Sequence, residues 1–276
     1  MNYLNMPAEN PFTVVYMNNE KNINKNIVAR SFSRGKTTYD ENAKIQQRVS
    51  WKLVKKLAKY PEIAPANVLE IGCCTGTLTE LLLSSCKVEK LYLNDLVASF
   101  HDVVMNRLEG AKGVEIIPMF GDIERLSLPE NLDLVISSAT FQWLADLKSL
   151  FAKIADALSE HGYLAYSIFG PGTLREFREI TDIGLQYSAV GTILDMMDQY
   201  FHIEEEETVK DILFFSSPRD ILRHLQATGV SGVMNYRWTP GTLREFESEY
   251  AERFGTASGI PVTYVSSYVI ASKKRR

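Results

Sequence analysis

Short apolar runs alternate with segments of helical periodicity through the middle of the chain, and this alternation constrains the fold more than any other feature. The apolar runs cover residues 68–71, 91–93, 114–120, 132–137 and 163–169. The segments with helical spacing of apolar side chains are 77–83, 97–108 and 147–158. Strands that alternate with helices are typical of a parallel sheet covered on both faces. The pattern predicts an α/β fold with a doubly wound, mostly parallel sheet.

Further elements flank this core. Apolar side chains at helical spacing begin near Ile23 and continue over residues 40–57. Residues 202–215 and 262–271 predict two late strands, and the second of these is rich in β-branched residues and tyrosine. We expect residues 1–22 to be a loose lead-in to a single domain that fills the rest of the chain.

One heptapeptide, Pro-Gly-Thr-Leu-Arg-Glu-Phe, occurs at residues 171–177 and again at 240–246. The similarity does not extend beyond the string, so a duplicated domain is not indicated. Each copy predicts a helix start, with its threonine as N-cap and its glutamate completing a capping box. The two predicted pairs are Thr173 with Glu176 and Thr242 with Glu245. We expect helical cap elements around residues 173–200 and 217–256.

Composition narrows the class of protein and the compartment in which we expect it. The 276 residues are 45% hydrophobic and 23% charged, which is typical of a globular protein. No apolar run approaches the ~18 residues of a membrane span, and the N-terminus lacks the apolar core of a signal peptide. Three cysteines are too few for a disulfide scaffold. We expect a cytoplasmic protein, and the net charge of -4 weighs against nucleic-acid binding.

The stretch Val68-Leu-Glu-Ile-Gly-Cys-Cys-Thr-Gly76 places two cysteines in a turn between a strand and a helix. Adjacent thiols lack the C-x-x-C spacing of a redox site, and no spaced pair of Cys or His matches a zinc site. The glycines carry more information, because a strand–turn–helix unit exposes backbone N–H groups where ligands of doubly wound sheets bind. The dinucleotide pattern G-x-G-x-x-G fails at Cys74 and Thr77.

The pattern Glu70-x-Gly72-x-x-x-Gly76 resembles the first motif of class I S-adenosylmethionine (SAM)-dependent methyltransferases, whose sheets have seven strands. Asp95 ends the second strand, close to the ~20-residue offset at which a carboxylate reaches ribose hydroxyls. Segment 121–123 resembles the family segment that frames adenine, and 140–143 follows the fourth strand on the substrate side. In isolation, Asp95 could equally be a helix N-cap.

Longer segments outside these motifs are similar to malonyl-acyl carrier protein O-methyltransferases of biotin synthesis. These segments are residues 30–46, 140–143, 169–176 and 222–230. The resemblance implies methyl transfer from SAM to the free carboxylate of a malonyl thioester, on carrier protein or on coenzyme A, with S-adenosylhomocysteine as product and no metal. Two alternatives stay open: a SAM enzyme acting on another small acid or a quinone, and a methyltransferase-like assembly factor.

The resemblance also implies roles for individual residues. The predicted cofactor-binding residues are Tyr39, Gln46, Glu70, Gly72, Cys73, Gly76, Asn94, Asp95, Leu96, Gly121, Asp122, Ile123 and Ser138. The predicted substrate-orienting residues are Arg34, Gln142, Trp143 and Arg175. No general base is expected, because a carboxylate with a pKa near ~4 is already ionised at neutral pH. Many relatives have Gly in place of Cys74, whose β-carbon is expected to crowd the methionine end of the cofactor.

Basic residues outnumber acidic ones from Ser217 onward. One interpretation is a solubilising surface. The other is a docking face for an acidic partner, and an acidic acyl carrier protein would be such a partner. On the second interpretation, the docking residues are Arg219, Arg223 and Arg244. No contact with nucleic acid or a membrane is expected.

Overall fold

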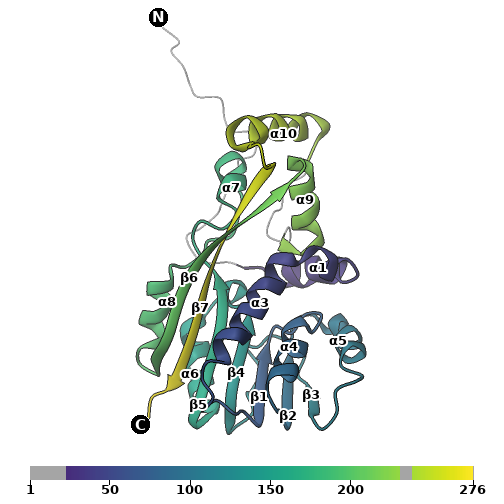
Figure 1. The fold of residues 1–276 in the computed structure, drawn as a ribbon. Helices are drawn as coiled ribbons and strands as arrows, with labels where there is room; N and C mark the ends of the chain where they lie inside the picture. The colour runs from purple at the N-terminus through teal and green to yellow at the C-terminus, as the bar shows by residue number, and fades with distance from the viewer. Residues whose placement is uncertain (1–22, 231–237, 276) are drawn as a thin grey trace, which may run out of the picture.

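The computed structural model describes residues 23–230 and 238–275, and the expected lead-in at 1–22 lies outside this range. A seven-stranded sheet forms its centre, with the order β3-β2-β1-β4-β5-β7-β6 (Figure 1). The strands are β1 (Asn67–Ile71), β2 (Lys90–Asn94), β3 (Glu115–Pro118), β4 (Leu132–Ser138), β5 (Leu158–Phe169), β6 (Phe201–Phe215) and β7 (Ile260–Lys273). β1 to β5 are parallel to one another, and β7 runs antiparallel to both of its neighbours. The predicted doubly wound, mostly parallel sheet is confirmed.

The order of the strands creates a crevice at the centre of the sheet. The chain runs from β1 outward through β2 to β3, and then returns to β4 on the other side of β1. Ligands of doubly wound sheets bind at such a switch point, outside the carboxyl ends of the strands. Ile71 pairs with Asn94 and with Ser137, so the residues that follow these three lie at one edge.

Helices cover both faces of the sheet. On one face lie α3 (Lys44–Leu57), α4 (Thr77–Ser85), η1 (Ala98–Phe100) and α5 (His101–Arg107). On the other lie α6 (Leu147–Ala157) and α8 (Val190–Met197). Successive residues of β1 alternate between the two cores, because Val68 packs with the first group and Leu69 with the second. No helix in the described ranges is both long and apolar enough to cross a membrane.

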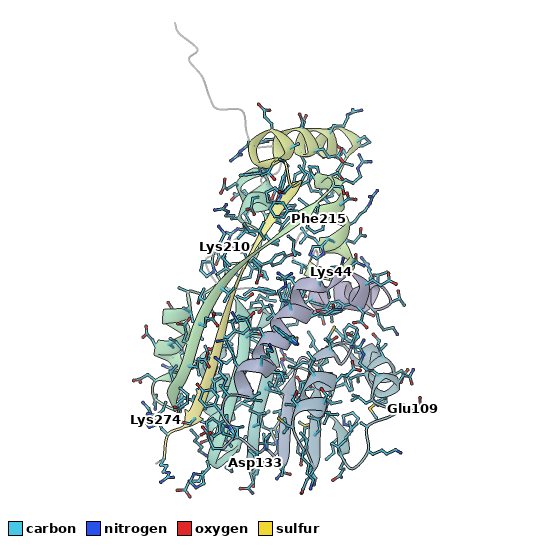
Figure 2. All side chains as sticks on the ribbon, viewed as in Figure 1. Lys44, Glu109, Asp133, Lys210, Phe215 and Lys274 are labelled. Atoms are coloured by element: carbon cyan, nitrogen blue, oxygen red, sulfur yellow. The ribbon has the colours of Figure 1, made fainter. Side chains whose placement is uncertain are left out.

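A cap stands beyond the carboxyl ends of the parallel strands (Figure 1). It contains α7 (Arg175–Thr181), α9 (Pro218–Ala227) and α10 (Pro240–Phe254), and α1 (Lys25–Gly35) packs against α9. β6 and β7 continue upward into it as a ribbon, on which Figure 2 labels Lys210 and Phe215, with Asp133 at the opposite end of the sheet. The expected cap range 173–200 is divided: α7 joins the cap, whereas α8 packs with α6 against the sheet.

The two heptapeptide copies fold differently, and both predicted capping boxes are wrong. In the first copy the helix begins only at Arg175, after Leu174 in a left-handed conformation. In the second copy it begins at Pro240, with Thr239 as N-cap and Thr242 completing the box. The local signal does not specify one conformation, because the first copy is bound to β7.

Candidate functional site

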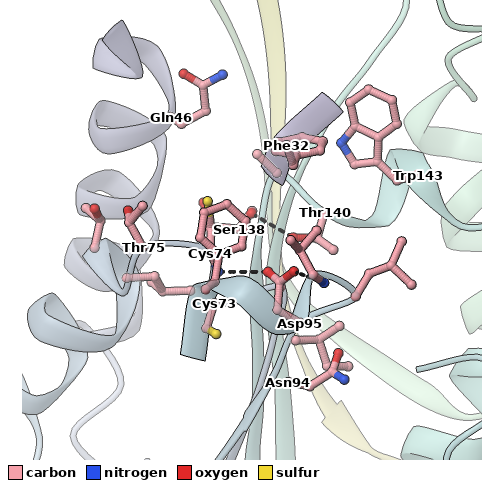
Figure 3. Close-up of a pocket in the computed structure, with 18 of the residues that line it drawn as sticks. Phe32, Gln46, Cys73, Cys74, Thr75, Asn94, Asp95, Ser138, Thr140 and Trp143 are labelled. Atoms are coloured by element: carbon pink, nitrogen blue, oxygen red, sulfur yellow. Dashed lines mark hydrogen bonds between the residues drawn. The ribbon is translucent and has the colours of Figure 1, made fainter. Parts of the chain in front are cut away.

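A cavity of about 830 Å³, counted to its open mouth, lies at the carboxyl ends of β1, β2 and β4 (Figure 3). The predicted cofactor-binding residues that line it are Tyr39, Gln46, Gly72, Cys73, Asn94, Asp95, Leu96, Ile123 and Ser138. Those that do not are Glu70, Gly76, Gly121 and Asp122. The cavity is therefore where the strand–turn–helix unit predicts a ligand.

Close packing shapes the turn after β1. Gly72 has φ +78°, and a β-carbon there would lie 2.0 Å from the Thr140 hydroxyl oxygen, so only glycine fits. Gly76, with φ +87°, leads directly into α4. Cys74 also has a positive φ, of 48°, although it carries a side chain. This conformation points the Cys74 backbone N–H at a carboxylate oxygen of Asp95, 2.8 Å away.

Asp95 lies at the floor of the cavity and is 7% exposed. Its second oxygen accepts a hydrogen bond from the backbone N–H of Val97 at 2.8 Å. Burial raises the pKa of Asp95 to about 6, although these two N–H donors oppose the rise. At neutral pH the side chain is mostly an anion, and each oxygen keeps a lone pair for a ligand.

Glu70, the acid of the first motif, has a different environment. It lies beneath the start of α4, and neither oxygen has a hydrogen-bond partner among the described residues. Burial raises its pKa to about 8, and Asp95 adds to the rise. The nearby Thr79 hydroxyl opposes the rise, although it is not in hydrogen-bond geometry with either oxygen. Near pH 7 the side chain is therefore mostly protonated. Because it does not line the cavity, it is not placed to contact a ligand there.

The loop after β3 reaches the cavity through Ile123. Its neighbour Asp122 is instead ion-paired with Lys25 of α1 at 2.5 Å, and Lys25 also pairs with Glu124. The Gly121 carbonyl accepts a hydrogen bond from the Asn94 side chain at 3.0 Å. The two ion pairs of Lys25 hold α1 against the loop after β3, at one end of the cavity.

Phe32, on α1, also lines the cavity, although the motifs in the sequence did not indicate it. It lines the cavity together with Val28, one helical turn earlier, and its ring meets Trp143 edge to face at 5.5 Å between centroids. The i,i+4 spacing of these two apolar residues was the signal for an inward-facing stripe.

A second cavity, of about 370 Å³, adjoins the first beneath the cap. It is lined by Phe32, Tyr39, Gln46, Ala139, Gln142, Trp143, Phe169, Thr173, Leu174, Leu185, Tyr187, Thr228, Val230 and Tyr264. Five of these residues also line the first cavity: Phe32, Tyr39, Gln46, Ala139 and Trp143. A wall of mostly aromatic side chains thus separates two sites that are close enough for a group to pass between them.

Neither predicted arginine lines either cavity. Arg34 is exposed on α1 beside residues 96–99, and Arg175 is half-exposed with its guanidinium 3.0 Å from Glu176. The structure therefore gives the proposed orienting role of these arginines no support, whereas Gln142 and Trp143 do line the second cavity.

Groups that could act as a base near the second cavity are neutral. Tyr264 shares a 2.7 Å hydrogen bond with His224, and burial lowers the pKa of His224 to about 4. Burial raises the pKa of Tyr187, which lines the same cavity. Within the described ranges, no group of three or more His, Cys, Asp or Glu residues is placed to bind a metal ion.

Known proteins agree with this architecture. Residues 69–166 match a family model described as a methyltransferase domain. The fold resembles the crystal structure of a putative methyltransferase from Bacillus halodurans, with a TM-score of 0.57 and 18% identity over 80% of this chain and 100% of the other. Fold and site together define a class I methyltransferase.

Comparison with known sequences identifies the family within this class. The chain is 36% identical over 237 residues to a malonyl-[acyl-carrier protein] O-methyltransferase from Calditerrivibrio nitroreducens, covering 86% of this chain and 92% of the relative. It is 34% identical to one from Acinetobacter baylyi, covering 91% and 98%. The chain belongs to the malonyl-[acyl-carrier protein] O-methyltransferase family, which confirms the resemblance seen in its motifs.

Proposed function

We propose that the protein transfers a methyl group from SAM to the free carboxylate of a malonyl thioester, giving the methyl ester that starts biotin synthesis. The observation that carries this proposal is the pair of cavities with a shared wall, in a chain of this family. One cavity suits the methyl donor, and the other suits a short acyl chain. The alternatives, a different small acid, a quinone or an assembly role, are not favoured by the relatives.

The residues of the first cavity fit SAM. The Asp95 carboxylate is placed to accept hydrogen bonds from the ribose hydroxyls, and Ile123 offers an apolar surface to adenine. The turn at Gly72 leaves room for the methionine part against the main chain. Tyr39 and Gln46 close the cavity from the N-terminal helices. SAM supplies a methyl group on a positively charged sulfur.

The protein's task is to align the reactants and exclude water. No base is required, because the acceptor carboxylate is already ionised. Holding two reactants in line can lower the activation barrier by roughly 7–11 kcal/mol. The rings of Phe32 and Trp143 keep the wall between the cavities apolar, which favours a reaction that brings opposite charges together and removes them.

The carrier protein is proposed to dock on α9 and α10. Arg219 is already paired with Glu247 at 2.6 Å, and Arg223 with Asp220 at 2.7 Å. Arg244 has no carboxylate partner among the described residues and is exposed. We therefore expect Arg244→Glu to raise the KM for the carrier-bound substrate most, mainly at low salt, and to leave the KM for malonyl-coenzyme A unchanged. An unchanged carrier KM at low salt would remove this docking proposal.

Mass spectrometry tests the function directly. Malonyl carrier protein and malonyl-coenzyme A are each incubated with the protein and SAM, and the expected product is heavier by one added methyl group. Hydrolysis of that ester should restore the starting mass. A protein that binds S-adenosylhomocysteine yet methylates neither thioester would contradict the proposed substrate.

A further inference from the structure

The acceptor carboxylate has to be held at the wall that the two cavities share. Five described residues form that wall, and two of them, Phe32 and Ala139, have no hydrogen-bonding side chain. The remaining three are Tyr39, Gln46 and Trp143, and all three are neutral. No Arg, Lys or His side chain lines either cavity within the described residues.

Tyr39 belongs to the cofactor half of the wall. Burial raises its pKa well above the ordinary value, and the next causes are the neighbouring Cys74 and Asp95, which both lie in the first cavity. Its hydroxyl thus has its polar surroundings on the donor side. Among the residues of the shared wall, this leaves Gln46 and Trp143 to face the acceptor.

Gln46 has an unsatisfied polar group. The side chain is 9% exposed on α3, and its Oε1 has no hydrogen-bond partner in the described part of the chain. A buried amide oxygen without a partner is costly unless a ligand or water completes it. In Figure 3 the Gln46 amide and the Trp143 indole lie on opposite sides of the upper part of the pocket, with Phe32 between them.

We propose, on the basis of the proposed function, that the Gln46 amide and the Trp143 indole N–H hold the reacting carboxylate through neutral hydrogen bonds, in place of an arginine. The terminal torsion of glutamine is broad, so the amide can turn its N–H toward an anion. One carboxylate oxygen is held, and the other forms a bond to the methyl carbon. The carbon–sulfur bond breaks, its electron pair goes to sulfur, and no proton moves.

Neutral donors suit this reaction physically. An arginine would stabilise the carboxylate strongly before transfer and would be left as a buried cation without a partner once the neutral ester forms. Amide and indole N–H groups hold the anion in position without neutralising it, so its charge is offset mainly by the sulfonium. Gln46 is on this account a substrate-positioning residue that the cofactor also touches.

The first test compares glutamine and arginine variants. Gln46→Ala should lower kcat/KM for malonyl-coenzyme A by about 10- to 100-fold, the value of a hydrogen bond to a charged group. The exposed Gln226 offers a matched control, since Gln226→Ala should change nothing. Arg34→Ala and Arg175→Ala should each change kcat/KM less than Gln46→Ala does. Calorimetry with S-adenosylhomocysteine reports whether each variant is folded with an intact donor site.

The second test reverses the hydrogen-bonding character of the position. Gln46→Glu places an acid against the substrate carboxylate, so its activity should rise as the pH falls and the introduced group becomes a donor, while the wild type shows no such rise. A malonamyl thioester, with an amide in place of the free acid, should inhibit Gln46→Glu more tightly than it inhibits the wild type.

The results distinguish a failure of the proposed function from a failure of the role proposed for Gln46. A wild-type protein that methylates no malonyl thioester contradicts the proposed function. If the wild type is active, any of three results overturns the role of Gln46. The first is that Gln46→Ala loses no more kcat/KM than Gln226→Ala, and the second is that an arginine variant loses more than Gln46→Ala. The third result is a Gln46→Glu variant that keeps the wild-type pH profile and inhibitor preference.

Discussion

The two copies of Pro-Gly-Thr-Leu-Arg-Glu-Phe share every residue and serve different parts of the cap. The copy at 240–246 forms the first turns of α10, with its glutamate in solvent. The copy at 171–177 leaves β5, turns through Gly172 with φ +94°, and lies against β7. Thr173 and Leu174 of this copy also line the second cavity.

Contacts with β7 account for the difference. Glu176 is 1% exposed and accepts hydrogen bonds from the Thr263 backbone N–H at 3.0 Å and from its hydroxyl at 2.5 Å. The Thr173 hydroxyl donates to the Val265 carbonyl at 3.1 Å and accepts from its N–H at 3.0 Å. These bonds fix the first copy to the sheet, so tertiary contacts outweigh its local tendency to start a helix. Matched substitutions in the two copies measure how far this holds.

The largest difference is expected between Glu176→Ala and Glu245→Ala. The first leaves the buried donors of Thr263 without a partner and should lower the free energy of unfolding by about 3 kcal/mol. The second changes an exposed residue, so its free energy of unfolding should stay within about 0.5 kcal/mol of the wild-type value. Urea denaturation of both variants checks this. Equal effects would mean that the contact with β7 does not distinguish the copies.

The pH dependence of the Glu176→Ala effect sharpens this comparison. Burial alone would raise the pKa of Glu176, but hydrogen bonds from Thr263 and Arg175 outweigh it and hold the pKa below its ordinary value. The carboxylate therefore contributes stability above the ordinary glutamate pKa, and that contribution is lost as the pH falls through the lowered folded value. The difference from wild type should shrink in acid; a constant difference would contradict this ionised, bonded state.

Alanine at the two glycines should act with opposite signs. Gly172→Ala forces a side chain into a left-handed conformation, 3.1 Å from a Val265 methyl, and should cost about 2 kcal/mol. Gly241→Ala adds a methyl group on a helix, at an ordinary contact distance of 3.8 Å from the Thr239 hydroxyl oxygen, and should stabilise by about 0.5 kcal/mol. Thermal unfolding of both variants measures the signs, and two changes of the same sign would show that the conformations are not fixed as described.

The smallest difference is expected at the threonines. Thr173→Ala leaves the Val265 N–H without its partner, at a cost of about 1 kcal/mol. It should also raise the KM for the thioester, because Thr173 lines the second cavity. Thr242→Ala removes one half of an exposed capping box and should cost about 0.5 kcal/mol, with no change in KM. Steady-state kinetics that failed to separate the two would argue against substrate binding beside Thr173.

Local periodicity predicted the sheet well, because strands such as β1 and β4 are apolar on both faces and end in turns. The positions of Gly72 and Asp95 at the cavity could be predicted as well, because each residue directly follows a strand that local periodicity indicates, β1 for Gly72 and β2 for Asp95. Glu176 was misjudged because its partner, Thr263, lies 87 positions further along the chain. No spacing in the sequence brings Tyr187 or Leu185 to the second cavity, since their positions there depend on how the cap packs.

The central claim is that the first cavity holds the methyl donor, with the Asp95 carboxylate on its ribose. Titration calorimetry with S-adenosylhomocysteine on wild type and Asp95→Asn tests it most directly. The account predicts about 10- to 100-fold weaker binding to the variant, and a wild-type affinity that falls as the pH drops below about 6, where Asp95 becomes protonated. Equal affinity in both proteins, with no change in wild-type affinity across that pH range, would contradict it.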